Sequence, residues 1–153
     1  MEIQPSPRIM VLGHSIVWQI AKFLAETSLP CVSANFHLTM APTVKFHGIG
    51  GWTVTKLWQF DLPAVTGFNP TVLVLEIGSN DLCNAKTNVA DLAANIFQPL
   101  QLFHFRFFVE HIIVSEILPR RQPPKLFPPY NTREFHLNRT LSHLCNNVPF
   151  ATF

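Results

Sequence analysis

The chain has 153 residues, of which 48% are hydrophobic and only 13% are charged, and its formal net charge is +2. This length suits one domain, and the apolar share excludes a globally disordered chain. The basic residues are scattered and only Arg120 and Arg121 are adjacent, which excludes the basic patch typical of nucleic-acid binders. We therefore expect a single domain over residues 1–153 without a nucleic-acid partner.

The sequence also carries little sign of export or of a bound metal. Residues 1–7 include Glu2 and two prolines where a signal peptide needs an apolar run. The longest apolar stretch, at 100–118, is interrupted by charged residues and histidines, so we expect no membrane span. The three cysteines form no C-x-x-C pair, which disfavours a disulfide framework or a zinc site. These features predict a cytoplasmic chain with no metal and no cofactor.

Short apolar runs alternate with helical patterns along the chain. In chain order we expect a strand at 9–12, a helix at 16–26, strands at 31–38 and 44–47, a helix at 53–60, a strand at 72–77, a helix at 89–107, a strand at 111–115, a proline-rich loop at 119–129, a helix from 131 to 144 and the beginning of a last strand at 149–153. Asn131 and Glu134 are expected to form a capping box at the start of the last helix. This alternation predicts an α/β fold with a mostly parallel sheet covered on both faces.

Three unusual loops follow predicted strands and should share the carboxyl edge of the sheet, where α/β proteins bind ligands. Ser15 follows the first strand at the start of a helix, where a hydroxyl faces unpaired N–H groups, or it is simply an N-cap. The pair Gly50-Gly51 allows a close backbone approach to a ligand, or forms an ordinary turn. Asn80 offers an amide donor, or serves as a turn-forming or capping residue. Together the three loops could hold the tetrahedral oxyanion of an acyl transfer.

These residues resemble a known family. The runs Val11-Leu12-Gly13-His14-Ser15, Gly48-Ile49-Gly50-Gly51-Trp52-Thr53 and Leu75-Glu76-Ile77-Gly78-Ser79-Asn80-Asp81 are similar, in order and spacing, to the first three blocks of the SGNH (GDSL-type) hydrolases. The resemblance implies a flavodoxin-like three-layer sandwich, and hydrolysis of a small-molecule ester without metal or cofactor. It also implies that Ser15 is the nucleophile and that the Ser15 and Gly51 N–H groups and the Asn80 amide form the oxyanion hole. The neighbouring Gly13, His14, Gly50 and Asp81 are expected to contact substrate.

One block of that family is absent, because no Asp in the 153 residues has His three positions later. A serine hydroxyl needs a base to become a good nucleophile, so we expect weak or no activity. His14 departs from the usual Asp, and its side chain is expected to point away from Ser15. His47 is the remaining candidate for a substitute base near this edge. The simplest interpretation is a chain truncated before the block, with the last helix missing and exposed apolar surface that favours self-association.

Two other functions stay open at this point. The same loops could hold an acyl or carbohydrate ligand without turning it over, which the missing base and His14 favour. A flavin or nucleotide site is also compatible with the fold class. However, the sequence contains neither G-x-G-x-x-G nor a P-loop motif, so this second alternative has little support.

Overall fold

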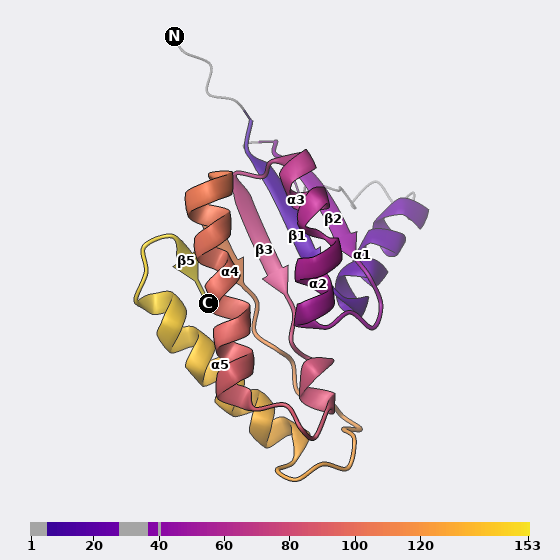
Figure 1. Cartoon of the computed structure of the whole chain (residues 1–153). Helices are drawn as coiled ribbons and strands as arrows, with labels where there is room; N and C mark the ends of the chain where they lie inside the picture. The colour runs from indigo at the N-terminus through magenta and orange to yellow at the C-terminus, as the bar shows by residue number, and fades with distance from the viewer. Residues whose placement is uncertain (1–5, 28–36, 40) are drawn as a thin grey trace.

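The computed structural model describes residues 6–27, 37–39 and 41–153 as one sheet with helices around it (Figure 1). Its elements are β1 (Arg8–Gly13), α1 (Ser15–Glu26), β2 (Thr43–Gly48), α2 (Val54–Phe60), α3 (Leu62–Phe68), β3 (Val72–Glu76), the 3-10 helix η1 (Asp81–Cys83), α4 (Val89–Phe107), β4 (His111–Val114), α5 (Tyr130–Asn146) and β5 (Ala151–Thr152). The strands are built from β-branched and other apolar residues, and turns rich in glycine or proline separate them from the helices.

The sheet is parallel throughout and has the strand order β2-β1-β3-β4-β5. The strand β1 lies between β2 and β3 and pairs Leu12 with His47 on one side and with Leu75 on the other. Because the register brings the ends of β1, β2 and β3 level, the loops that follow these strands meet at one edge. The predicted α/β class with a mostly parallel sheet is confirmed.

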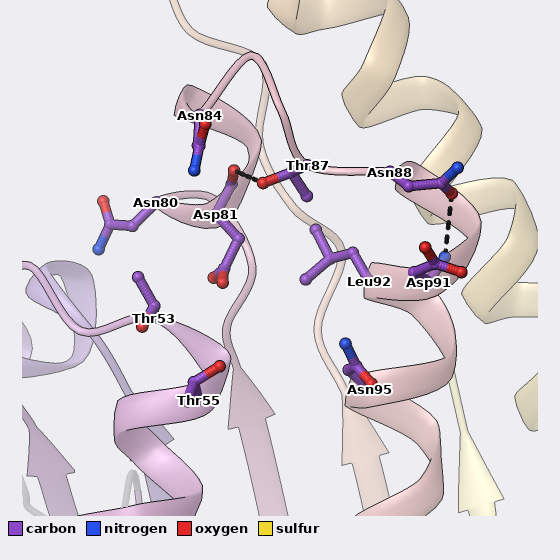
Figure 2. Close-up of a pocket in the computed structure, with 10 residues that line it drawn as sticks. All are labelled: Thr53, Thr55, Asn80, Asp81, Asn84, Thr87, Asn88, Asp91, Leu92 and Asn95. Carbon is purple, nitrogen blue, oxygen red and sulfur yellow. Dashed lines mark hydrogen bonds between the residues drawn. The ribbon is translucent and has the colours of Figure 1, made fainter.

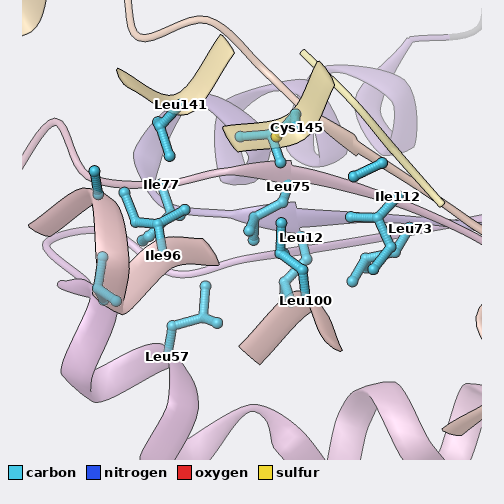
Figure 3. Packing of buried hydrophobic residues seen from close by; sticks show 14 of the residues in the cluster. Leu12, Leu57, Leu73, Leu75, Ile77, Ile96, Leu100, Ile112, Leu141 and Cys145 are labelled. Carbon is cyan, nitrogen blue, oxygen red and sulfur yellow. The ribbon is translucent and has the colours of Figure 1, made fainter. Parts of the chain in front are cut away.

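One face of the sheet forms the main core. Alternate strand residues point to this face and are fully buried, among them Leu12, Leu73 and Leu75 (Figure 3). Side chains from α2, α3, α4 and α5 complete the same cluster. Burying a leucine or isoleucine side chain contributes about 1.5–3 kcal/mol relative to leaving it exposed, so this layer supplies much of the stability.

The opposite face is covered less completely. The intervening residues of β3, Val72 and Val74, are only partly buried, and Ile113 of β4 is 38% exposed. On this face α1 packs against β1 and β2, and Val17 is its buried residue. Trp18 and Phe23 on α1 are 48% and 55% exposed. Self-association through such apolar surface stays a prediction.

Two expectations from the sequence are wrong and one lies outside the described residues. The capping box is wrong because the N-cap of α5 is Pro129, two residues before Asn131, and the Asn131 amide instead bonds both backbone groups of Arg120. The helix α3 was not expected, and Pro63 in its first turn is compatible with a helix start. The predicted strand at 31–38 falls mostly on residues 31–36, which lie outside the described part of the chain.

Candidate functional site

Hydrogen bonds join the loops at the carboxyl ends of β1, β2 and β3. The N–H of Ile49, after β2, donates to the carbonyl of Gly13 at the end of β1 at 3.1 Å. The Asn80 amide, after β3, donates to the Trp52 carbonyl at 2.8 Å. Gly13 is needed at this crossing because a Cβ there would collide with the Glu76 carbonyl oxygen. The structure thus brings together the three loops that the sequence singled out.

Ser15 is the first residue of α1 and lies in a pocket of about 250 Å³. The pocket is lined by His14, Ser15, Ile16, Glu76, Ser79, Leu118, Pro119 and Arg120. The N-cap of the helix is His14, and no side chain caps it, so the alternative that Ser15 is merely the cap is wrong. The Ser15 hydroxyl is therefore left at the positive end of a helix, inside a cavity.

His14 is buried beneath this pocket against a carboxyl group from β3. Its side chain is only 2% exposed, and its Nδ1 lies 3.1 Å from Oε2 of Glu76. Such a contact favours a charged pair, but burial outweighs it and both groups move toward their neutral forms. Burial raises the pKa of Glu76 to about 7, and burial together with the charge of Arg120 lowers the pKa of His14 to about 4. Near neutral pH His14 is uncharged and Glu76 titrates.

The raised pKa of Glu76 gives a testable dependence of stability on pH. Between its ordinary pKa of 4.5 and about 7 the folded state binds more protons than the unfolded state, so this contribution to stability is lost as the pH rises through 7. His14 acts in the opposite direction, because its lowered pKa adds stability as the pH rises from about 4 toward 6.5. We expect Glu76→Gln to be more stable than the wild type, by a margin in Tm that grows from about pH 5 to about pH 8.

Thermal melts followed by circular dichroism at the two pH values check this expectation. The matched control is Glu110→Gln, which removes an exposed carboxyl group and should show no pH-dependent gain. A gain for Glu76→Gln that is equal at both pH values would contradict the raised pKa.

Gly50 and Gly51 form the turn between β2 and α2. Gly51 has a φ of +75°, a left-handed conformation that glycine adopts without strain. The turn leads to Trp52, whose carbonyl accepts the hydrogen bond from Asn80. Neither glycine is among the residues that line the pocket of Ser15. Whether the Gly51 N–H reaches a substrate oxygen therefore stays a prediction.

Asn80 is held at both ends of its amide. Its Nδ2 donates one hydrogen to the Trp52 carbonyl, and its Oδ1 accepts from Nη2 of Arg120 at 3.4 Å. Although Asn80 is the N-cap of η1, its side chain makes no capping bond, so the alternative of a capping role is wrong. The amide is fixed in orientation and keeps a second hydrogen on Nδ2.

Asp81 binds the start of α2 rather than the pocket of Ser15. Its two carboxylate oxygens accept from the Val54 N–H at 3.1 and 3.3 Å, and burial raises its pKa.

Asp81 and Asn80 also line a neighbouring pocket of about 400 Å³ between η1, α2 and α4 (Figure 2). All its lining residues but one are polar: Thr53, Thr55, Asn80, Asp81, Asn84, Thr87, Asn88, Asp91, Leu92 and Asn95. Thus Ser15 and Asn80 line adjoining pockets on the same edge.

Arg120 lines the pocket of Ser15 and hydrogen-bonds Asn80, which lines the neighbouring pocket; its presence at the site was not predicted from the sequence. Its Nη2 donates to the Ser79 hydroxyl at 2.9 Å as well as to Asn80. The signal that could have suggested it is its position shortly after β4, on the edge where the other loops lie.

A second arginine that was not predicted from the sequence holds the loop that contains η1. Arg133 on α5 is 3% exposed, and its guanidinium donates to the carbonyls of Leu82, Asn84 and Thr87. These bonds attach the η1 loop, which contains Asn80, to α5.

His47, the candidate substitute base, forms a pair of its own. Its Nε2 lies 2.7 Å from Oδ1 of Asp61, a residue between α2 and α3. His47 is in register with Leu12, so its side chain shares the face of the main core, and it does not line the pocket of Ser15. No hydrogen bond joins the Ser15 hydroxyl to a histidine within the described residues.

Comparisons with known proteins find the same fold in solved structures, although no sequence relationship is found. No family model and no curated protein sequence matches the chain. Among solved structures it is similar to a GDSL-like lipase from Parabacteroides merdae, with a TM-score of 0.69, 16% identity and coverage of 95% of this chain and 76% of the other. A GDSL-like lipase from Bacteroides thetaiotaomicron gives a TM-score of 0.68 at 19% identity, with coverage of 97% and 71%.

An acetylxylan esterase from Geobacillus stearothermophilus is also similar, with a TM-score of 0.63, 15% identity and coverage of 96% of this chain and 75% of the other. The chain spans 76% of the length of the Parabacteroides merdae lipase and 65% of the length of another similar structure. Within the described residues no helix is long and apolar enough to cross a membrane. The sheet order, the joined loops and these similarities lead to one conclusion: the chain has the fold of the SGNH (GDSL-type) hydrolases.

Proposed function

We propose that this chain is an SGNH-type serine ester hydrolase acting on a small ester. The observation that carries the proposal is the meeting of the Ser15, Trp52 and Asn80 loops at one sheet edge, with Ser15 facing a pocket. The similar solved structures are described as lipases and acetylxylan esterases, and a catalytic mutant of one esterase replaces a serine by alanine.

In the proposed reaction the Ser15 oxygen forms a bond to the acyl carbon, and the bond from that carbon to the alcohol oxygen breaks. The alcohol leaves with the proton that Ser15 loses. Water then cleaves the acyl-serine, which releases the acid and restores the hydroxyl. The negative charge on the carbonyl oxygen would be held by the N–H groups of Ser15 and Gly51 and by the free hydrogen of the Asn80 amide.

We expect this chain to hydrolyse esters slowly. The sequence contains no D-x-x-H, and His47 is bonded to Asp61 on the face of the main core. A triad stripped of its base retains only the contribution of the oxyanion hole and of binding, roughly 10³–10⁴-fold over water. Cleavage of the acyl-serine needs an activated water, so this second step should be the slower one.

The test is to trap the acyl-serine. The chain is incubated with 4-nitrophenyl acetate, quenched in acid and digested, and its peptides are examined by mass spectrometry. We expect one acetyl group on Ser15, which Ser15→Ala removes and the control Ser142→Ala, on α5, retains. Equal release of 4-nitrophenol by the wild type and Ser15→Ala, with no acetyl group on Ser15, would exclude Ser15 as the nucleophile.

A second candidate function is binding without turnover. It is favoured by the absence, among the described residues, of a base bonded to the Ser15 hydroxyl. It is also favoured by the pocket of Figure 2, whose amide, hydroxyl and carboxylate groups suit a ligand rich in hydroxyls such as a saccharide. Under this alternative, methyl β-D-xyloside should raise Tm equally in the wild type and in Ser15→Ala, and no acetyl group should appear on Ser15. Absence of any shift in Tm would count against it.

A further inference from the structure

Arg120 is fixed in the pocket of Ser15 by contacts along its whole length. The Asn131 amide accepts from the Arg120 N–H at 3.0 Å and donates to its carbonyl at 3.4 Å. The guanidinium carbon lies 5.1 Å from the centre of the Tyr130 ring, and Nη2 bonds Ser79 and Asn80. A guanidinium held in this way loses little side-chain entropy when a ligand binds to it.

The guanidinium of Arg120 forms no ion pair with the part of the chain that the structure describes. Within the described residues its hydrogen bonds go to neutral oxygens, and no carboxylate lies within 4.0 Å of it. Glu76 lines the same pocket, but burial raises its pKa to about 7, so below that pH it is mostly neutral. A half-buried cation without a partner is costly, and an anion that enters the pocket would remove that cost.

The rest of the pocket limits the kind of anion. Ile16, Leu118 and Pro119 supply apolar surface beside Ser15 and Arg120, and the volume of about 250 Å³ suits a short chain. We propose that Arg120 binds the terminal carboxylate of a short acidic acyl group, such as a succinyl group, whose other end is the ester carbonyl presented to Ser15. This inference rests on the proposed hydrolysis for its catalytic consequence, but not for the binding itself.

Binding is tested without turnover by two matched amides. N-methylsuccinamate carries the acyl chain with its carboxylate, and N-methylbutanamide has the same length without the charge. In chemical-shift titrations of the wild-type chain at about pH 6, we expect the succinamate to bind at least about 10-fold more tightly, because a charge-assisted bond to Arg120 is added. The backbone amide resonances of Ser15, Ser79 and Arg120 should shift during the titration.

Variants assign the preference to one side chain. In Arg120→Gln the affinities for the two amides should differ by no more than about twofold. Arg120→Lys should keep part of the preference for the succinamate because the positive charge remains. The matched control is Arg121→Gln, which removes an adjacent exposed cation and should keep the full preference. The proposal is overturned by equal affinities in the wild type, by no binding of the succinamate, by a preference that persists in Arg120→Gln, or by shifts confined to other residues.

A turnover experiment separates this inference from the hydrolase proposal. The wild type and Arg120→Gln are compared on 4-nitrophenyl hemisuccinate and 4-nitrophenyl butyrate, with acylation of Ser15 as the readout. We expect Arg120→Gln to slow acylation by the hemisuccinate about 10-fold more than acylation by the butyrate, whose rate reports any effect that passes through Asn80. If the succinamate binds but neither ester acylates Ser15, the hydrolase proposal fails and the anion pocket stands. If Arg120→Gln slows acylation equally with both esters, Arg120 stabilises the oxyanion, directly or through Asn80. That result would overturn the proposed specificity for an acidic acyl group.

Discussion

Replacing Arg133 by methionine should lower the free energy of unfolding by about 3 kcal/mol. The side chain is buried, and its guanidinium donates to three backbone carbonyls of the η1 loop, at Leu82, Asn84 and Thr87. Methionine keeps much of the volume but donates no hydrogen bond, so these carbonyls lose their partner. Urea unfolding followed by tryptophan fluorescence and by circular dichroism measures the loss.

The matched control for this prediction is Arg139→Met on the exposed side of the same helix, which should change the free energy of unfolding by less than about 0.5 kcal/mol. Similar values for the two variants would show that the bonds from Arg133 to the loop contribute little to stability.

The variant Asn80→Ala should lower kcat for 4-nitrophenyl acetate by about 10²-fold or more. Without the base of the family, catalysis depends mainly on the groups that hold the oxyanion. Alanine removes the amide donor and also the bonds to the Trp52 carbonyl and to Arg120. Steady-state rates of 4-nitrophenol release, corrected for the buffer reaction, measure the effect.

Asn84→Ala provides the comparison for Asn80→Ala, because Asn84 lies on the same loop and, among the described residues, its side chain makes a single exposed hydrogen bond, from the Lys86 N–H. Its kcat should stay within about twofold of the wild type. If Asn80→Ala keeps the wild-type kcat while remaining folded, Asn80 is not an oxyanion donor.

Local patterns were sufficient to predict most of the fold. The runs Ile9–Leu12, Val72–Ile77 and His111–Ser115 are apolar and short, and each became a strand of the parallel sheet. Parallel order then places the following loops at one edge, so the convergence of the Ser15 and Asn80 loops could be expected before any coordinates. The candidate site residues of these loops could also be predicted, because their types and their positions directly after the strands are visible in the sequence.

The contacts that hold the site could not be predicted in the same way. Arg133 binds carbonyls 46 to 51 positions earlier in the chain, and a backbone carbonyl has no sequence signature. The capping box failed for a related reason, because the spacing of Asn131 and Glu134 matches a motif while the Asn131 amide is used by Arg120 across a loop. Whether such polar groups bond locally or at long range depends on the packing of α5.

The unequal covering of the two sheet faces also has a consequence for how the sequence can vary. Leu73 and Leu75 of β3 are sealed in the main core, whereas Val72 and Val74 between them are partly open to solvent. Within this one strand, neighbouring positions are therefore under very different constraint. Polar replacements should accumulate at alternate positions as the gene drifts, while the positions between them remain aliphatic.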